Sequence, residues 1–256
     1  MADRIELRNV FFTYQSNERE VLAVKDVSFT VEAGQFVCLV GPSGCGKTTI
    51  MNMLAGFLKP TAGEILVGGR PGVASSDRAV VFQDFAQLFP WRSVRANVEF
   101  GLEMRKMPAP QRRETAMEFL RLVKLEKFAE SYPHQLSGGM QQRAAIARAL
   151  AYNPSVLLMD EPFAALDAMT RDEMQRMLAD IWAATKKTVI YITHNVAEAV
   201  YLGDKVVVLR AHPGSVTTII DVDLPRLREP LTPAFANLQK DILHALSHPG
   251  EIATAA

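Results

Sequence analysis

The chain has 256 residues, 48% of them hydrophobic, and it carries 28 basic and 28 acidic side chains. It is long and apolar enough for one large domain, or for a domain with a subdomain. The balanced charge argues against the net basic surface of a nucleic-acid-binding protein, and no apolar run approaches the ~18 residues of a membrane span. Because the first residues show no secretory h-region and the two cysteines, Cys38 and Cys45, suit a reducing compartment, we expect a cytoplasmic location.

The amino-terminal region is rich in predicted β-strands. The stretches IELRNVFFTY and VSFTV alternate between apolar and polar residues, and EILV and AVVF are further short strand candidates. FVCLV, residues 36–40, is uniformly apolar, which favours a buried parallel strand. A predicted helix follows, and its apolar residues at helical spacing are Ile50, Met53, Leu54 and Phe57.

The loop between this strand and this helix fits the pattern G-x-x-x-x-G-K-[ST] of a phosphate-binding loop. Its glycines let the backbone curl, so that successive N–H groups point inward and form an anion nest. Lys47 adds a positive charge for the terminal phosphates, and Thr48 offers a hydroxyl to Mg²⁺. We therefore predict a nucleoside triphosphate site formed by Gly41, Pro42, Ser43, Gly44, Cys45, Gly46, Lys47, Thr48 and Thr49.

The pattern turns helical from about residue 94 to residue 152. One predicted helix has its apolar face at Ala116, Phe119, Leu120 and Val123, and MQQRAAIARALA is rich in good helix formers. The strand candidates VLLMD, TVIYIT, KVVVL and VTTII follow, and FANLQKDILHAL closes the chain as an amphipathic helix. This order suggests a helical subdomain inserted into an α/β core.

Two carboxylates, Asp160 and Glu161, come at the end of the apolar strand 156–160. Ligands bind at the carboxyl ends of strands in α/β folds, so these side chains are expected near the nucleotide. Asp160 can hold Mg²⁺ through water, and Glu161 can polarise a water for attack on the γ-phosphate.

A second candidate anion site is LSGGMQQR, residues 136–143. Ser137, Gly138 and Gly139 precede an alanine-rich helix, and a helix start of this kind binds anions. One protein rarely needs two such sites for one nucleotide.

Together these motifs resemble those of the ATP-binding subunit of an ABC transporter. In that family the segment from Leu136 to Gly139 is the signature motif, which binds the γ-phosphate of an ATP held by the other copy. The family usually has glutamine at the next position, where this chain has Met140.

The resemblance implies roles for four further residues. Gln83 in VVFQD matches the Q-loop residue, which can reach Mg²⁺, and Asp167 in AALD matches the D-loop residue. His194 in YITHN matches the switch histidine, a donor to the γ-phosphate, and Tyr14 matches the aromatic residue that stacks on adenine.

The implied fold is an α/β P-loop NTPase of the ABC ATPase type, with an N-terminal antiparallel β subdomain. We expect the ATPase domain over residues 4–221, a helical subdomain inserted at about 88–152, and a short C-terminal tail with a helix over 222–256. The family reading implies an ATP hydrolase acting as a head-to-tail homodimer around two ATP. It also implies transmembrane permease subunits, an indirect solute-binding partner, no nucleic acid, and a peripheral place on the cytoplasmic face of the inner membrane.

Three kinds of ABC protein remain open: an importer subunit, an exporter subunit and a non-transport protein. The single cassette and the neutral charge argue against the third kind. The segment FQDFAQLFPWRSVRANVEFGLEMR is similar to importers for nitrate, sulfonates and taurine. Its apolar cluster is either part of the core or a groove for a permease helix, and the second interpretation expects partial exposure of Phe85, Leu88, Phe89 and Trp91 beside Pro90.

Overall fold

The computed structural model describes residues 2–15, 19–72, 77–84 and 87–248. The chain divides into two compact units, one made of residues 1–75 and 186–256 and the other of residues 76–185. The expected helical block, residues 88–152, lies within the second unit. Among the described residues, no helix is both long and apolar enough to cross a membrane.

A four-strand run in the order β10-β9-β3-β8 forms the centre of the first unit. Its strands are β3 (Phe36–Val40), β8 (Thr188–Thr193), β9 (Lys205–Arg210) and β10 (Ser215–Asp221). β3 pairs in parallel with β8 and β9, and β9 pairs antiparallel with β10. Every residue of β3 and β8 is buried, as the continuous apolar sequence of both strands predicts.

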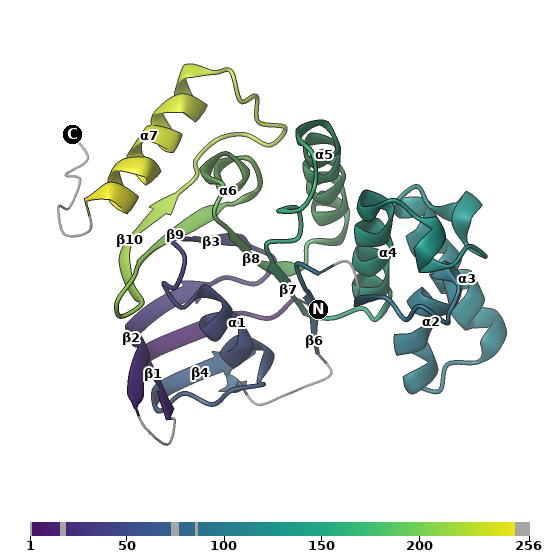
Figure 1. Cartoon of the computed structure of the whole chain (residues 1–256), viewed down its shortest axis with the longest axis horizontal. Helices are drawn as coiled ribbons and strands as arrows, with labels where there is room; N and C mark the ends of the chain where they lie inside the picture. Colours follow the sequence, from purple (N-terminus) through teal and green to yellow (C-terminus); the bar gives the residue numbers. More distant parts are fainter. Residues whose placement is uncertain (1, 16–18, 73–76, 85–86, 249–256) are drawn as a thin grey trace. The chain divides into compact units, whose positions relative to one another are not determined.

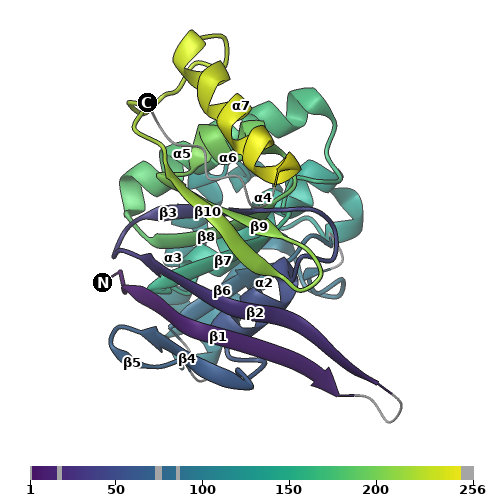
Figure 2. The same cartoon turned by 90° about the vertical axis from the view of Figure 1, so that its left-hand side faces the viewer.

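An antiparallel sheet in the order β2-β1-β4-β5 forms the other layer of this unit, and Figure 2 shows its strands side by side. The strands are β1 (Ile5–Gln15), β2 (Glu20–Val31), β4 (Ala62–Val67) and β5 (Arg70–Pro71). Alternate residues are buried, for example Ile5 and Leu7 in β1. The predicted N-terminal antiparallel subdomain is therefore present.

Within the described part of the first unit, the helices are α1 (Lys47–Ala55), α6 (Val196–Leu202) and α7 (Pro233–Ser247). The expected apolar face of α1 is correct for Ile50, Met53 and Leu54, which are buried, but wrong for Phe57, which is 61% exposed. The helix ends before it, because Gly56 adopts a left-handed conformation (φ 80°) and its N–H caps the last turn. α7 packs on α6, β9 and β10 (Figures 1 and 2).

The segment after β10 is bound to the first unit by two arginines. Arg226 donates to Leu202 O and pairs with Asp204. Arg228 is 6% exposed, and its guanidinium donates to the carbonyls of Val200, Tyr201, Gly203, Val222 and Leu224 at 2.5–3.3 Å. Burial lowers the pKa of Arg228 to about 10, so the group stays charged at neutral pH at the C-terminal end of α6. Residues 222–228 are thus an integral part of this unit.

The second unit contains a parallel strand pair and a group of helices. The strands are β6 (Arg78–Val81) and β7 (Val156–Asp160), and the α-helices are α2 (Val94–Met104), α3 (Ala109–Leu122), α4 (Gly138–Ala151) and α5 (Ala168–Thr185). Two short 3-10 helices, η2 (Glu126–Phe128) and η3 (Pro133–Gln135), lie between α3 and α4. α2, α3 and α4 pack on one another (Figure 1). Ser93 caps α2, since its hydroxyl accepts from Ala96 N.

Replacing Arg228 with methionine tests the importance of the buried cation. The methionine keeps an apolar stem but leaves buried carbonyls of α6 without a donor, which should lower the free energy of unfolding by about 3 kcal/mol. The control is Arg8→Met, which removes a half-exposed cation bonded to Glu6 and Glu64 and should change stability little. Urea denaturation of both variants measures the difference, and equal losses would contradict the capping role of Arg228.

Candidate functional site

The predicted phosphate loop curls around the ammonium of Lys47. Gly46 is the N-cap of α1 and has a φ of 84°, a left-handed conformation that favours glycine. The Lys47 side chain is 8% exposed, and its Nζ donates to Gly41 O at 2.7 Å and to Pro42 O at 2.9 Å. The lysine therefore holds the loop closed at the start of α1.

Close backbone packing supports the loop from outside. A Cβ at Gly41 would lie 2.5 Å from Cys45 Sγ and 2.7 Å from Leu209 O. A Cβ at Gly214 would lie 2.3 Å from Cys45 O, so the turn between β9 and β10 can approach the loop only with glycine at this position. Sequence reasoning missed Gly214, which stands far from the motif in the chain. The predicted loop residue Cys45 is itself buried.

Hydroxyl groups gather at the first turn of α1. Thr48 is exposed, whereas Thr49 is 8% exposed and its Oγ1 lies 3.1 Å from the hydroxyl of Tyr14. The Tyr14 ring stays 45% exposed and packs edge-on against Phe12. The structure thus brings Tyr14 to the phosphate loop, and the exposed loop residues Pro42, Ser43 and Gly44 lie in the same unit.

His194 belongs to the same unit as the phosphate loop. It follows the last residue of β8, Thr193, and is exposed although Thr193 is buried. Asn195 then caps α6, with its Oδ1 accepting from Ala197 N and Glu198 N. An exposed imidazole between two anchored neighbours is in position to contact a ligand.

Asp160 and Glu161 lie in the second unit, at the end of β7, and both are half-buried. Glu161 has a φ of 42°, which is unusual for a residue with a side chain. Strained backbone of this kind concentrates at functional sites. The next turn is fixed by Arg171, whose guanidinium donates to Phe163 O and Leu166 O.

Asp167 precedes α5 and is exposed. It accepts from Thr170 N at 3.0 Å and from Thr170 Oγ1 at 2.7 Å, as an N-cap residue does. These two hydrogen bonds lower the pKa of Asp167. A Cβ at Gly139 would lie 2.9 Å from Thr170 Cγ2, so the predicted signature and D-loop segments adjoin each other.

The signature segment begins α4. Ser137 is exposed and caps the helix, with its Oγ accepting from Met140 N at 3.3 Å. Leu136 is buried, and Gln141 donates to the carbonyls of Pro133 and Leu136. Ser137, Gly138 and the backbone of the first turn therefore form the helix start that the sequence predicts.

Gln83 follows β6 and is exposed. The chain after it is anchored to α4 by three polar side chains that sequence reasoning missed. Gln87 donates to Phe82 O and to Gln142 Oε1, and Gln142 is fully buried. Arg148 donates to Gln87 O at 2.7 Å. The sequence signals for these anchors were Gln142 and Arg148, a glutamine and an arginine within the alanine-rich helix α4.

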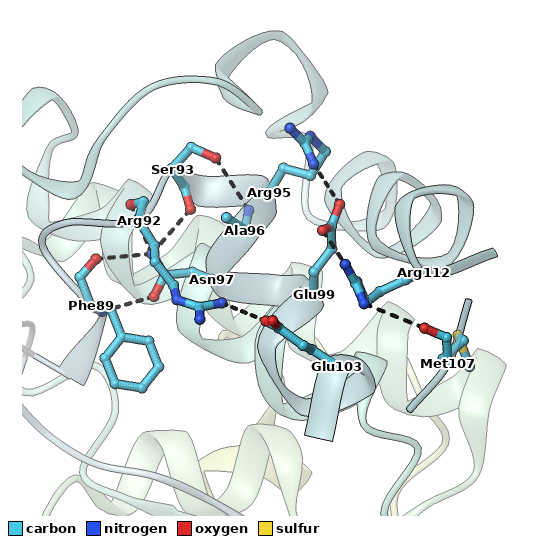
Figure 3. A network of polar contacts seen from close by, with 10 residues as sticks. All are labelled: Phe89, Arg92, Ser93, Arg95, Ala96, Asn97, Glu99, Glu103, Met107 and Arg112. Carbon is cyan, nitrogen blue, oxygen red and sulfur yellow. Dashed lines mark hydrogen bonds and ion pairs between the residues drawn. The ribbon is translucent and has the colours of Figure 1, made fainter. Parts of the chain in front are cut away.

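Asn97 fixes the next turn of this segment, as Figure 3 shows. The side chain is fully buried, and its Oδ1 accepts from Phe89 N at 2.8 Å. Its Nδ2 donates to the carbonyls of Phe89, Arg92 and Ser93 at 3.0–3.1 Å. A polar residue between Val94 and Val98 on a buried helix face was the sequence signal for this anchor.

The apolar cluster at this turn divides between core and surface. Leu88 is 3% exposed, so its expected partial exposure is wrong. Phe89 is half-buried and Trp91 is 72% exposed, with ring centroids 5.5 Å apart. The Arg92 guanidinium lies 5.0 Å from the Phe100 ring centroid and pairs with Glu103 at 2.8 Å (Figure 3). Phe85 lies outside the described residues.

Comparison with known proteins decides the family. Residues 24–164 match the ABC transporter family. The chain belongs to this family. The taurine import ATP-binding protein TauB of Rhizobium johnstonii is 43% identical over 99% of each chain. The nitrate import ATP-binding protein NrtD of Synechocystis sp. is 44% identical over 86% of this chain and 83% of the relative.

A solved structure agrees with this assignment. The dimeric post-hydrolysis state of the ATP-binding cassette MJ0796, bound to ADP and Pi, is 35% identical and superposes with a TM-score of 0.76, covering 86% of this chain and 100% of that chain. The predicted ABC ATPase fold is therefore confirmed. The protein is an ATP-binding subunit of the ABC type and an ATP hydrolase coupled to transport.

Lys47→Ala tests the phosphate loop. The change removes the cation and the donor to Gly41 O and Pro42 O, so we expect ATP affinity to fall about 100-fold, equal to about 2.7 kcal/mol. Lys25→Ala, which removes an exposed cation from β2, is the control and should bind ATP normally. Titration calorimetry measures both, and wild-type affinity in Lys47→Ala would contradict the assignment of the loop.

Proposed function

We propose that the protein is the ATP-hydrolysing subunit of an import complex. In this complex two copies bind head-to-tail around two ATP, and hydrolysis drives uptake of a small anion or organic solute such as nitrate, a sulfonate or taurine. The proposal is supported by the names of the relatives, which are import ATP-binding proteins for taurine and nitrate. It places the subunit on the cytoplasmic face of the inner membrane, against permease subunits that receive solute from a solute-binding protein.

The observation that carries the dimer is that the chain has two helix starts of the kind that binds anions, in two separate units. One is the phosphate loop at α1, and the other is the signature segment at α4. In the proposed dimer the phosphate loop holds the ATP of its own chain, and Ser137 and Gly139 close on the γ-phosphate of the other ATP. Asp167 adjoins the signature segment and would reach the same interface.

The proposed roles of the reacting groups follow from the chemistry of their side chains. Lys47 and the loop amides neutralise the phosphates, and Tyr14 stacks on adenine. Glu161 accepts a proton from the attacking water, and His194 donates to the γ-phosphate. This assignment uses a carboxylate for proton transfer and hydrogen-bond donors, Lys47 and His194 among them, for the developing charge.

The proposed Mg²⁺ ligands are Thr48, Gln83 and Asp160, the last through water. All offer oxygen, the ligand atom that Mg²⁺ prefers, and an ion with few protein ligands suits a site completed by phosphate and water. The described residues contain no group of three or more His, Cys, Asp or Glu side chains that would form an all-protein metal cage. Bound Mg²⁺ would neutralise charge on the β- and γ-phosphates.

The permease is proposed to dock at the turn that Asn97 anchors. Trp91 is a large exposed aromatic side chain on rigid backbone, and such residues dominate binding energy at protein interfaces. The next residue, Arg92, pairs with Glu103 (Figure 3). A cytoplasmic helix of a permease with an apolar face fits this surface.

Glu161→Gln tests catalysis and dimerisation together. An amide cannot take a proton from water, so we expect the variant to bind ATP normally but to lose at least about 100-fold in kcat. ATP then persists, and the variant should accumulate as a dimer. Light scattering with and without ATP measures the association.

The control for the composite site is Ser137→Arg in the Glu161→Gln background. The added bulk and charge lie at the start of α4, away from the phosphate loop in sequence, so ATP affinity should persist while the dimer is lost. A Glu161→Gln protein that stays monomeric with ATP bound would contradict the proposal that each ATP is bound between two chains.

Trp91→Ser separates docking from core packing. Because Trp91 is 72% exposed, this variant should keep its melting temperature and ATP affinity but lose co-purification with co-expressed permease subunits. Leu88→Ser, at 3% exposure, should instead lose about 3 kcal/mol of stability. Full co-purification of Trp91→Ser would exclude this turn as the permease surface. Transport assays of the complete complex distinguish the two directions, since ATP-driven export of solute would indicate an exporter subunit.

A further inference from the structure

A buried carboxylate of α6 is bonded to the strand that ends beside His194. Glu198 is 4% exposed, and its Oε2 accepts from Thr193 Oγ1 at 2.6 Å and from the Tyr191 hydroxyl at 3.1 Å. Both hydroxyls come from β8. Burying a carboxylate costs several kcal/mol unless hydrogen bonds compensate, so its presence here calls for a reason beyond packing.

The hydrogen bonds continue through both neighbours of His194. The Thr193 hydroxyl donates to Glu198 and accepts from Asn195 N at 3.0 Å. Asn195 Oδ1 accepts from Ala197 N at 2.9 Å and from Glu198 N at 3.3 Å. The Glu198 carboxylate therefore holds the Thr193 hydroxyl, which in turn holds the Asn195 N–H, while the Asn195 side chain bonds to the backbone at the start of α6.

The short bond from Thr193 orients its hydroxyl. A hydroxyl has one proton, and giving that proton to the carboxylate leaves its lone pairs facing the Asn195 N–H. Bonds to an ionised acceptor are shorter and about twice as strong as neutral ones. A carboxylate at position 198 therefore fixes the turn more firmly than an amide of the same shape would.

α6 is held at its other end as well. Arg228 donates to the carbonyls of Val200, Tyr201 and Gly203, which close the helix. The helix spans only Val196–Leu202, too short to be stable alone, so these two attachments set its position. The residues on both sides of His194 are thus bonded to β8 and α6, and the His194 side chain between them is exposed.

We propose that Glu198 is a positioning residue for His194, acting through the Thr193 hydroxyl to hold the imidazole where it meets the γ-phosphate. The inference rests on the proposed role of His194 and adds a residue that touches neither nucleotide nor metal. It makes Glu198 important for the rate of the reaction and unimportant for ATP binding.

The test compares Glu198→Leu and Glu198→Gln with Val200→Ala. Val200 lies on the same helix and is fully buried, so its truncation destabilises α6 without removing a bond to the turn. We expect Glu198→Leu to lower kcat about tenfold while the KM for ATP stays within about twofold, since misplacement of a reacting group affects the transition state first. Glu198→Gln, which keeps the shape and the acceptor, should show a smaller loss, and Val200→Ala should keep wild-type kcat.

A second measurement is made without nucleotide. The Asn195 amide is bonded to Thr193 Oγ1, so its hydrogen exchange should become about tenfold faster in Glu198→Leu and stay unchanged in Val200→Ala. If the leucine variant fails to fold, Glu198→Gln is measured instead, and its Asn195 exchange should become faster by a smaller factor, because its amide oxygen still accepts from Thr193.

The outcomes separate the two claims. A His194→Ala protein with wild-type kcat would contradict the proposed role of the histidine. If His194→Ala is inactive but the Glu198 variants match Val200→Ala in both kcat and Asn195 exchange, the positioning role is wrong and the function of His194 stands.

Discussion

The closed phosphate loop depends on backbone atoms that approach one another more closely than side chains allow. Gly41 lies against Cys45 and the carbonyl of Leu209, and Gly214 lies against the carbonyl of Cys45. These contacts bring β9, the turn after it and the loop together at the end of β3. With the loop supported from outside and closed by Lys47 from inside, α1 begins with its N–H groups directed at one place. Nucleotide binding should therefore require little rearrangement of the loop, since the anion site is already formed.

The signature segment is also a helix start, but close contacts through glycine support it on one side only. Ser137 supplies the cap, and Gly139 allows Thr170 to approach the first turn of α4. The two sites differ in what they lack: the phosphate loop has a cation, and the signature segment has none among its first residues. A helix start without a cation is expected to bind phosphate weakly by itself and to add to the binding of a phosphate that another group already neutralises. This difference is the physical reason to propose that it serves an ATP held elsewhere.

The sequence predicted the motifs and the fold class because these depend on local order: strand, glycine loop and helix, or apolar strand followed by carboxylates. It misjudged Phe57, because one glycine in a left-handed conformation ends α1 early. It misjudged Leu88, because a cluster of apolar residues in an irregular segment does not reveal which side chains turn inward. Gly214 and Arg228 could not be found from spacing, since each acts on backbone that is distant in sequence. For Asn97 the only signal was a polar residue on an apolar helix face, which does not reveal the turn that it holds.

These missed residues share a physical role. Asn97, Glu198 and Arg228 are polar groups buried in a largely apolar interior. Asn97 and Arg228 bond to the carbonyls of a turn and of a helix end, and Glu198 bonds to two hydroxyls of β8, one of them on the residue before His194. Apolar packing is not directional, so it cannot hold an irregular segment in one conformation. A buried amide or charge can, because every unmade bond costs free energy and only one arrangement makes them all. Asn97 applies this constraint to the turn carrying Trp91, and Glu198 and Arg228 apply it to the helix after His194. The proposed docking residue Trp91 and the proposed catalytic residue His194 are thus exposed where buried hydrogen bonds hold the backbone beneath them.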